Sequence, residues 1–370
     1  MNKRKHYNPN SFNALDAALA FISLLIVFEI FRNIFISIVR PLINSPDFDY
    51  YLFDCIDSIL SQSVIFIVAF IWCGIRRVSF FSGGGFVYKF DMVQILFSVL
   101  LVFGIYFLVY QTHLKFNDDL LRIFYQKDLN TYYEELESKI KGNVGFALLS
   151  VYVLTPLLPC FIEEIFYRGI IMRGLRQFGV TFSIVLSSIC FSLMHGNFEQ
   201  IVLQFVGGLA IASAVSLTGN MLVGVAMHFA NNFFPVFFNV FINGFDLSRY
   251  LGAEFAEAMM ILFGVICFVV SAAYFINMLV VKTRRHALNE PETLSVKDSA
   301  CYAEIKRKDE AVWQTIYPVQ INESLIYDGN YVYKYKNKES KINSRSNNVL
   351  SIAFLAVGII LSVVLIFVHI

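Results

Sequence analysis

The sequence has few charged residues. Lys, Arg, Asp and Glu make up 15% of the 370 residues, and 57% of the residues are hydrophobic. Soluble domains contain about 25% charged residues, so this chain cannot cover a water-facing surface with polar side chains. The composition therefore predicts a polytopic membrane protein, with the lipid bilayer and no nucleic acid among its partners.

Paired cysteines and the common zinc-protease motif are also missing. The six cysteines are scattered and include no CxxC, which argues against a disulfide framework or a structural zinc cluster. No HExxH helix motif is present, although that motif places two zinc ligands on one helix face. The first apolar stretch, residues 14–39, is too long for the core of a signal peptide, so we expect it to be retained.

Long apolar runs dominate what remains. A membrane-spanning helix needs about 20 mostly apolar residues, and this criterion predicts an all-α fold with about eight to nine transmembrane helices. The candidate spans are 14–39, 58–75, 91–112, 145–162, 179–195, 199–217, 220–242, 255–281 and 348–370.

Basic clusters between these runs predict the orientation. Lys and Arg residues precede the first span and follow the second, fourth and eighth spans. The positive-inside rule then puts all four clusters, and the N-terminus, in the cytoplasm. The chain divides into N-terminal helices with an outer loop (1–144), a helical core (145–242), one more helix (243–283), a cytoplasmic insert (284–346) and a C-terminal helix (347–370). Alternating residues around Asp328 and Gly329 predict a β-hairpin in the insert, which could bind a protein partner.

Charged residues inside apolar runs usually mark function or a buried pair. Within "FIEEIFYRG", Glu164 and Arg168 are spaced i, i+4, the favourable order for an ion pair. Glu163 then faces another direction, about 100° around the helix. Pro159 suits a first helical turn, which would place both glutamates near a helix N-terminus, where the dipole favours negative charge.

Two histidines complete the set of candidates. A turn near Phe178 and Gly179 would bring His195 to nearly the depth of Glu163 in an antiparallel hairpin. His228 and Asn232 share one face of a later helix. Another pair, Glu29 and Arg32 in the first span, is more simply a mutually neutralising pair, or an arginine that snorkels outward.

Three motifs resemble those of a known family. They are EExxxR (Glu163 to Arg168), FxxxH (Phe191 to His195) and HxxxN (His228 to Asn232). In this order, on adjacent apolar helices, they are similar to the motifs of the CAAX-protease and bacteriocin-processing family, also called CPBP or Abi. The resemblance implies an intramembrane endopeptidase core over roughly 145–242 that cuts membrane-associated peptides or proteins.

The resemblance also implies a role for each residue. Glu163 and His195 would act on the water, His228 and Asn232 would stabilise the oxyanion, and Glu164 and Arg168 would be accessory. Glu163, His195 and His228 could instead hold one divalent metal such as zinc, so both glutamate-type and metal-dependent chemistry remain open. Peptide maturation or bacteriocin immunity in a bacterial cell membrane would fit relatives of this kind.

Two other functions compete with proteolysis. Carboxylates and histidines within a membrane also serve as proton relays in secondary transporters or ion channels, but the sequence shows no inverted repeat and its polar residues lie in one block. A non-catalytic scaffold is the other alternative. Such a scaffold need not keep all four of Glu163, His195, His228 and Asn232.

Overall fold

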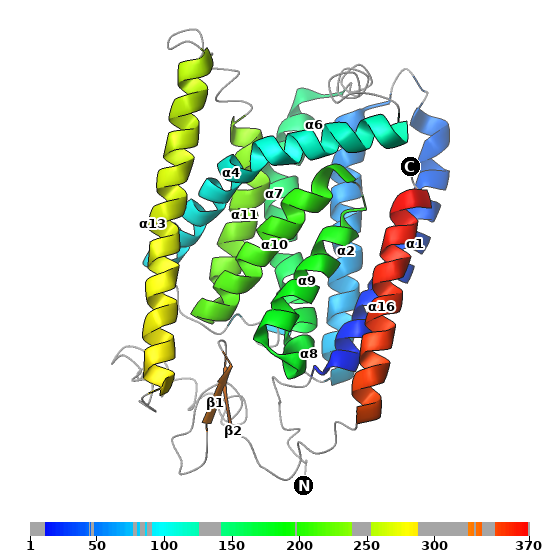
Figure 1. The fold of residues 1–370 in the computed structure, drawn as a ribbon. Helices are drawn as coiled ribbons and strands as arrows, with labels where there is room; N and C mark the ends of the chain where they lie inside the picture. Colours follow the sequence, from blue (N-terminus) through cyan, green and yellow to red (C-terminus); the bar gives the residue numbers. More distant parts are fainter. Residues whose placement is uncertain are drawn as a thin grey trace, which may run out of the picture.

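The structure is a computed structural model that describes residues 12–43, 45, 48–76, 80–81, 86, 91–125, 142–196, 198–238, 253–287, 325–328, 331–334 and 345–368. Figure 1 shows a bundle of helices that run mostly side by side, with α4 running obliquely to the others. The elements are α1 (Ala14–Ile43), α2 (Tyr50–Arg76), α4 (Met92–Tyr125), α6 (Val144–Leu149), η1 (Ser150–Leu154), α7 (Thr155–Glu164), η2 (Ile165–Met172), α8 (Arg173–Leu175), η3 (Arg176–Phe178), α9 (Val180–Met194), α10 (Phe198–Thr218), α11 (Met221–Phe238), α13 (Ala253–Ala287), β1 (Leu325–Asp328), β2 (Tyr331–Lys334) and α16 (Arg345–Val368).

The predicted all-α polytopic membrane fold is confirmed. Among the described residues, six helices are long and apolar enough to cross a membrane, and two shorter apolar helices accompany them. The six are Ala14–Ile43, Tyr50–Arg76, Val144–Phe178, Gln200–Thr218, Ala258–Val281 and Asn348–Phe367, and the shorter two are Met92–Leu108 and Val180–Met194. The protein is thus an integral membrane protein, while a total of eight to nine spans stays a prediction.

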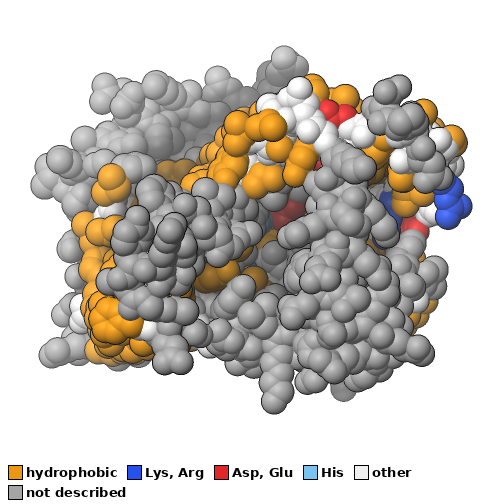
Figure 2. Space-filling model, turned by 90° about the horizontal axis from the view of Figure 1, so that it is seen from above, with side chains coloured by type: hydrophobic (Ala, Val, Ile, Leu, Met, Phe, Trp, Pro, Cys, Tyr) orange, Lys and Arg blue, Asp and Glu red, His pale blue; other side chains and the backbone are white. Residues whose placement is uncertain are grey.

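Apolar side chains cover the outside of the bundle. Ile266 on α13 is 51% exposed and Ile360 on α16 is 63% exposed, although both side chains are strongly hydrophobic. Figure 2 looks down on one end of the bundle, and most of the coloured side chains there are hydrophobic, with few acidic or basic groups. Such a surface is stable in lipid and unstable in water, because the transfer of one apolar side chain out of water is favourable by about 1.5–3 kcal/mol.

Residues 144–178 form one continuous helical stretch, which changes its winding twice. Two π-helical segments, η1 and η2, flank the α-helical segment α7. The expected helix start at Pro159 was wrong. Pro156 occupies the first turn of α7, Pro159 lies inside it, and both glutamates lie at its C-terminal end. Membrane helices tolerate an internal proline, because neighbouring groups and local π adjustments compensate for the missing hydrogen bond.

The turn predicted after this stretch is confirmed. The 3₁₀ segment η3 ends at Phe178, and Gly179 adopts a φ of 105°, which favours glycine over other residues. The chain then reverses into α9, which packs on η2 and α10, while α11 packs on α7 and α4. The helices that carry the three motifs are therefore neighbours in the middle of the bundle.

The flanking helices lie on opposite sides of this core. On one side α1 packs between α16 and α2, and on the other side α13 packs along α4 (Figure 1). Helix α2 also contacts α7. The N-terminal and C-terminal helices are thus assembled against the helices of the predicted core.

Several basic side chains gather at one end of the bundle. Arg76 at the end of α2 pairs with Asp16 at the start of α1, at 2.5 Å. Arg176 donates to Ser216 near the end of α10. We call this the basic end. His195, at the C-terminus of α9, lies at the other end of that helix from Arg176. Which end faces the cytoplasm stays a prediction.

Most of the predicted cytoplasmic insert, 284–346, lies outside the described residues. Its described part includes β1 and β2, which pair antiparallel with Asp328 opposite Tyr331 and Leu325 opposite Lys334. This pairing agrees with the hairpin expected around Asp328, although Gly329 lies outside the described residues. The insert's role and its partner stay predictions.

Candidate active site

Glu163 lies between a glutamine and a histidine from two other helices. Gln62 of α2 donates from Nε2 to Oε1 of Glu163 at 2.7 Å. The other carboxylate oxygen, Oε2, lies 3.8 Å from Nε2 of His228 on α11. All three side chains are buried, and Glu163 is 8% exposed. One oxygen of Glu163 is therefore fixed, and the other faces an imidazole nitrogen across a gap.

The neighbouring glutamate points into a separate ion pair. Oε1 of Glu164 accepts from Arg168 Nη1 at 2.8 Å and contacts Nδ1 of His228 at 2.9 Å. Because a carboxylate paired with arginine can only accept, Nδ1 of His228 is the protonated nitrogen in this contact. His228 therefore directs Nε2 towards Glu163, and no hydrogen-bond partner of Nε2 occurs in the described part of the chain.

Arg168 is fully buried, which is rare for a cation in a membrane bundle. Three groups compensate its charge. These are the carboxylate of Glu164, the backbone oxygen of Gly208 at 3.3 Å, and the face of the Phe191 ring 4.6 Å from the guanidinium carbon. A cation over an aromatic ring is stabilised by the ring quadrupole. Arg168 thereby joins η2 to α9 and α10.

Phe191 also brings the two histidines together. Its ring centroid lies 5.0 Å from the His195 ring and 5.3 Å from the His228 ring, with an edge-on arrangement in both cases. Nδ1 of His195 lies 2.9 Å from the backbone oxygen of Phe191, so Nε2 is the nitrogen left for other contacts. The matched depth expected for Glu163 and His195 stays a prediction.

Asn232 lies one turn beyond His228 and has weaker contacts. Its amide donates to the backbone oxygen of Thr155 at 3.5 Å and accepts from Asn231 at 3.4 Å. The preceding Asn231 is buried and donates to Gln204 of α10 at 3.2 Å. The structure thus holds Asn232 against the start of α7, and its expected place on the oxyanion stays a prediction.

The proposed metal set finds no support in the side-chain geometry. Within the described residues, no group of three or more His, Cys, Asp or Glu side chains could hold a metal ion. We therefore derive no catalytic step through a metal.

Sequence reasoning missed Gln62 and the structural role of Phe191. A signal for Gln62 was present, because the polar residues of the α2 sequence recur at helical spacing. Residues with this spacing are Asp54, Asp57, Ser58, Ser61 and Gln62. A polar stripe on an otherwise apolar membrane helix should face the protein interior, and Gln62 does so.

Together these features define a class: a helical membrane protein with a buried carboxylate–histidine site built from adjacent spans. Residues 145–234 match the family model described as "Type II CAAX prenyl endopeptidase Rce1-like". This segment of the chain is therefore similar to the Rce1-like family, which is consistent with the CAAX-protease and bacteriocin-processing family that the motifs resemble. Comparison with curated proteins and with solved structures gives no match.

Proposed function

We propose that this protein is an intramembrane endopeptidase that hydrolyses peptide bonds of membrane-associated peptides or proteins. The observation that carries the proposal is the 3.8 Å approach of Glu163 Oε2 to His228 Nε2 within the Rce1-like segment. Hydrolysis needs a base for water and a group that stabilises the oxyanion. A carboxylate and an imidazole that face each other across a buried gap can supply both.

In the proposed reaction, Glu163 Oε2 takes a proton from a water molecule that His195 Nε2 helps to hold. The water oxygen attacks the peptide carbonyl carbon, and the carbonyl oxygen becomes negatively charged. Protonated His228 donates from Nε2 to that oxygen, and the amide of Asn232 is the second donor. Glu163 then gives its proton to the leaving nitrogen as the carbon–nitrogen bond breaks, which returns the carboxylate to its starting state.

Neighbouring residues orient and neutralise the proposed catalytic groups. Glu164 accepts from Nδ1 of His228, so it fixes the orientation of the imidazole ring. Gln62 holds the non-reacting oxygen of Glu163, which leaves Oε2 free to move the proton. Arg168 neutralises Glu164, so the two adjacent glutamates do not repel each other as two unpaired charges would.

The test is cleavage of labelled membrane peptides by protein reconstituted in lipid nanodiscs. The substrates are a prenylated CAAX peptide, the same peptide without its lipid, and a set of transmembrane peptides. We expect wild type to cut at least one of them and Glu163→Gln and His195→Ala to lose about 10²–10⁴-fold of the rate. Cleavage at the wild-type rate by either variant would contradict the proposed role of the residue that it replaces.

Two controls sharpen this experiment. Cys160 is buried on α7, three residues before Glu163, and its thiol donates to the backbone oxygen of Leu157. Cys160→Ala should keep activity, which separates this mechanism from a cysteine nucleophile on the same helix. A chelator arm separates the glutamate-type reaction from a metal-dependent one. Ion flux through liposomes without any cleavage would favour the transporter.

A further inference from the structure

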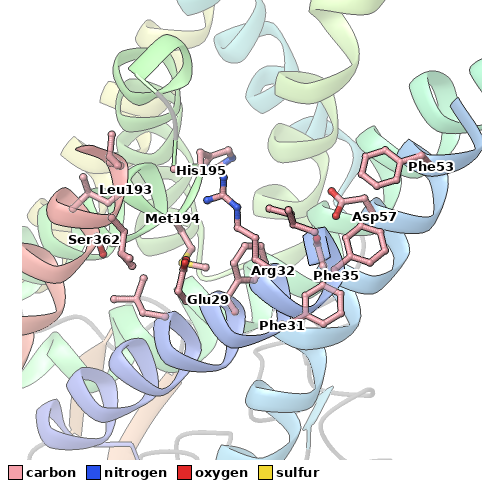
Figure 3. A pocket seen from close by; sticks show the side chains of 17 residues that line it. Glu29, Phe31, Arg32, Phe35, Phe53, Asp57, Leu193, Met194, His195 and Ser362 are labelled. Atoms are coloured by element: carbon pink, nitrogen blue, oxygen red, sulfur yellow. The ribbon is translucent and has the colours of Figure 1, made fainter. Parts of the chain in front are cut away.

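A pocket of about 390 Å³ lies next to the candidate active site. Helices α1, α2 and α16 and the C-terminal end of α9 form its walls (Figure 3), so three of its four walls come from outside the Rce1-like segment. His195 lines this pocket and also contacts the Phe191 ring. The pocket and the candidate active site therefore share the side chain of His195.

The pocket walls are mostly aromatic and aliphatic, with a small polar group. Apolar walls come from Phe28, Phe31, Phe35, Phe53, Met194 and Leu365. The polar residues that line it are Glu29, Arg32, Asp57, Ser61, His195 and Ser362. Pockets for small ligands share this pattern, with apolar walls and a few polar groups that fix orientation.

Arg32 is the donor of this polar group. Its side chain points into the pocket towards His195, and Asp57 lies on the opposite wall (Figure 3). The described residues include no ion pair between Arg32 and a carboxylate. Glu29 instead accepts from the Asn33 amide at 2.7 Å.

On the basis of the proposed endopeptidase function, we propose that this pocket binds the substrate peptide beside the bond that is cut. A peptide segment presents carbonyl acceptors, amide donors and side chains. The pocket offers the matching groups: a guanidinium donor, a carboxylate acceptor and aromatic walls that favour an apolar or aromatic side chain. A lipid acyl chain would fill the apolar walls but leave Arg32 and Asp57 without partners, at the cost of their desolvation.

The location of the pocket also indicates the side of the bundle from which a peptide would reach His195. The pocket is lined by Phe53, Asp57 and Ser61 in the first half of α2, whereas Arg76 ends that helix. On α16 it is lined by Ser362, Leu365 and Ile366 near the C-terminal end of the helix. The peptide would thus reach His195 from the half of the bundle remote from the basic end.

Site-specific photocrosslinking tests binding without relying on cleavage. A benzophenone amino acid replaces Ser362, which lines the pocket, or Val364, which is 48% exposed on the same helix. Both proteins carry Glu163→Gln to stop turnover and are illuminated in nanodiscs with the fluorescent transmembrane peptides. We expect a peptide adduct from position 362 and none above background from position 364. Adducts to phospholipid alone at position 362 would overturn the proposal.

Kinetics of pocket variants provide the second arm. Ser362→Phe narrows the pocket, and Val364→Phe adds the same side chain on the lipid-facing side. For peptides with phenylalanine next to the cleaved bond, Ser362→Phe should raise KM at least tenfold relative to peptides with alanine there. Val364→Phe should change KM for neither set of peptides. Arg32→Gln should raise KM while Arg40→Gln, on an exposed site of the same helix, should not.

The outcomes separate this proposal from the proposed function. Cleavage that depends on Glu163, combined with no adduct at position 362 and no change in KM, would refute the pocket and leave the endopeptidase intact. A peptide adduct at position 362 without any cleavage by wild type would support the pocket and refute the endopeptidase.

Discussion

The two adjacent glutamates should differ in how much stability the protein loses when each is replaced by glutamine. Glu164 is fully buried and is shared by Arg168 and His228. In Glu164→Gln the shape is kept, but the buried guanidinium loses its counter-charge and one amide hydrogen points at a donor. Removing one partner of a buried ion pair costs about 3–5 kcal/mol. We expect Glu164→Gln to lose stability on this scale.

Glu163→Gln should behave differently. Its carboxylate accepts one hydrogen bond, from Gln62, and lies too far from His228 for a second. A glutamine there can still accept from the Gln62 amide, and the substitution leaves no buried cation unpaired. The cost should be about 1.5–3 kcal/mol at most, the range for one hydrogen bond to a charged group. Under the proposed mechanism, Glu163→Gln should lose catalysis and keep the fold.

Thermal unfolding of both variants in the same nanodiscs checks this difference. We expect a clearly lower melting temperature for Glu164→Gln than for Glu163→Gln. Glu164→Gln combined with Arg168→Met should recover part of the loss, because the unpaired cation is gone. Equal melting temperatures for the two single variants would refute the assignment of Glu164 to the structural ion pair and Glu163 to the chemistry.

Three further predictions test separate contacts. Gln62→Leu removes the hydrogen bond to the carboxylate of Glu163, the proposed general base, so kcat should fall about 10–100-fold and its pH profile should change. KM for the best peptide should stay near its wild-type value. An unchanged kcat and pH profile would show that Gln62 is only a packing residue. Hydrogen bonds from backbone amides, that of Leu52 first, hold the pKa of Asp49 below its usual value of 3.8, so its contribution to stability is present above that value and is lost as the pH falls through the lower, folded-state pKa. The difference in melting temperature between wild type and Asp49→Asn should therefore shrink as the pH is lowered to about 3, and a constant difference would contradict it. A Cβ at Gly224 would lie 2.7 Å from Val215 and 2.9 Å from Glu164, whereas a Cβ at Gly74 would meet nothing within 4 Å. Gly224→Ala should therefore destabilise the protein and lower its activity, while Gly74→Ala should be neutral or stabilising by up to about 1 kcal/mol. Melting curves and cleavage rates of the two variants check this difference.

The sequence predicted the membrane fold because each long apolar run needs no tertiary information to be recognised. It also predicted the meeting of Glu163 with His228, since three spaced motifs on consecutive helices leave few ways to assemble. The turn at Gly179 followed from local chemistry, because a glycine between two apolar runs favours a positive φ.

Other features depended on contacts between distant segments. The helix start was misplaced at Pro159, because a proline is compatible with both a first turn and the interior of a membrane helix. The role of Arg32 could not be read from its i, i+3 spacing with Glu29, since the pocket that it lines is built from four helices. The attachment of Gln62 to Glu163 joins residues 101 positions apart, which no local pattern predicts.

Gln62 on α2 makes the candidate active site a composite of two parts of the chain. The segment that matches the family model carries both acids and both histidines, but the amide that fixes the orientation of Glu163 comes from upstream of it. Transplanting residues 145–234 into another scaffold would carry over both glutamates and both histidines and leave the Glu163 carboxylate free to rotate. The orientation of Glu163 therefore depends on the docking of α2 against α7.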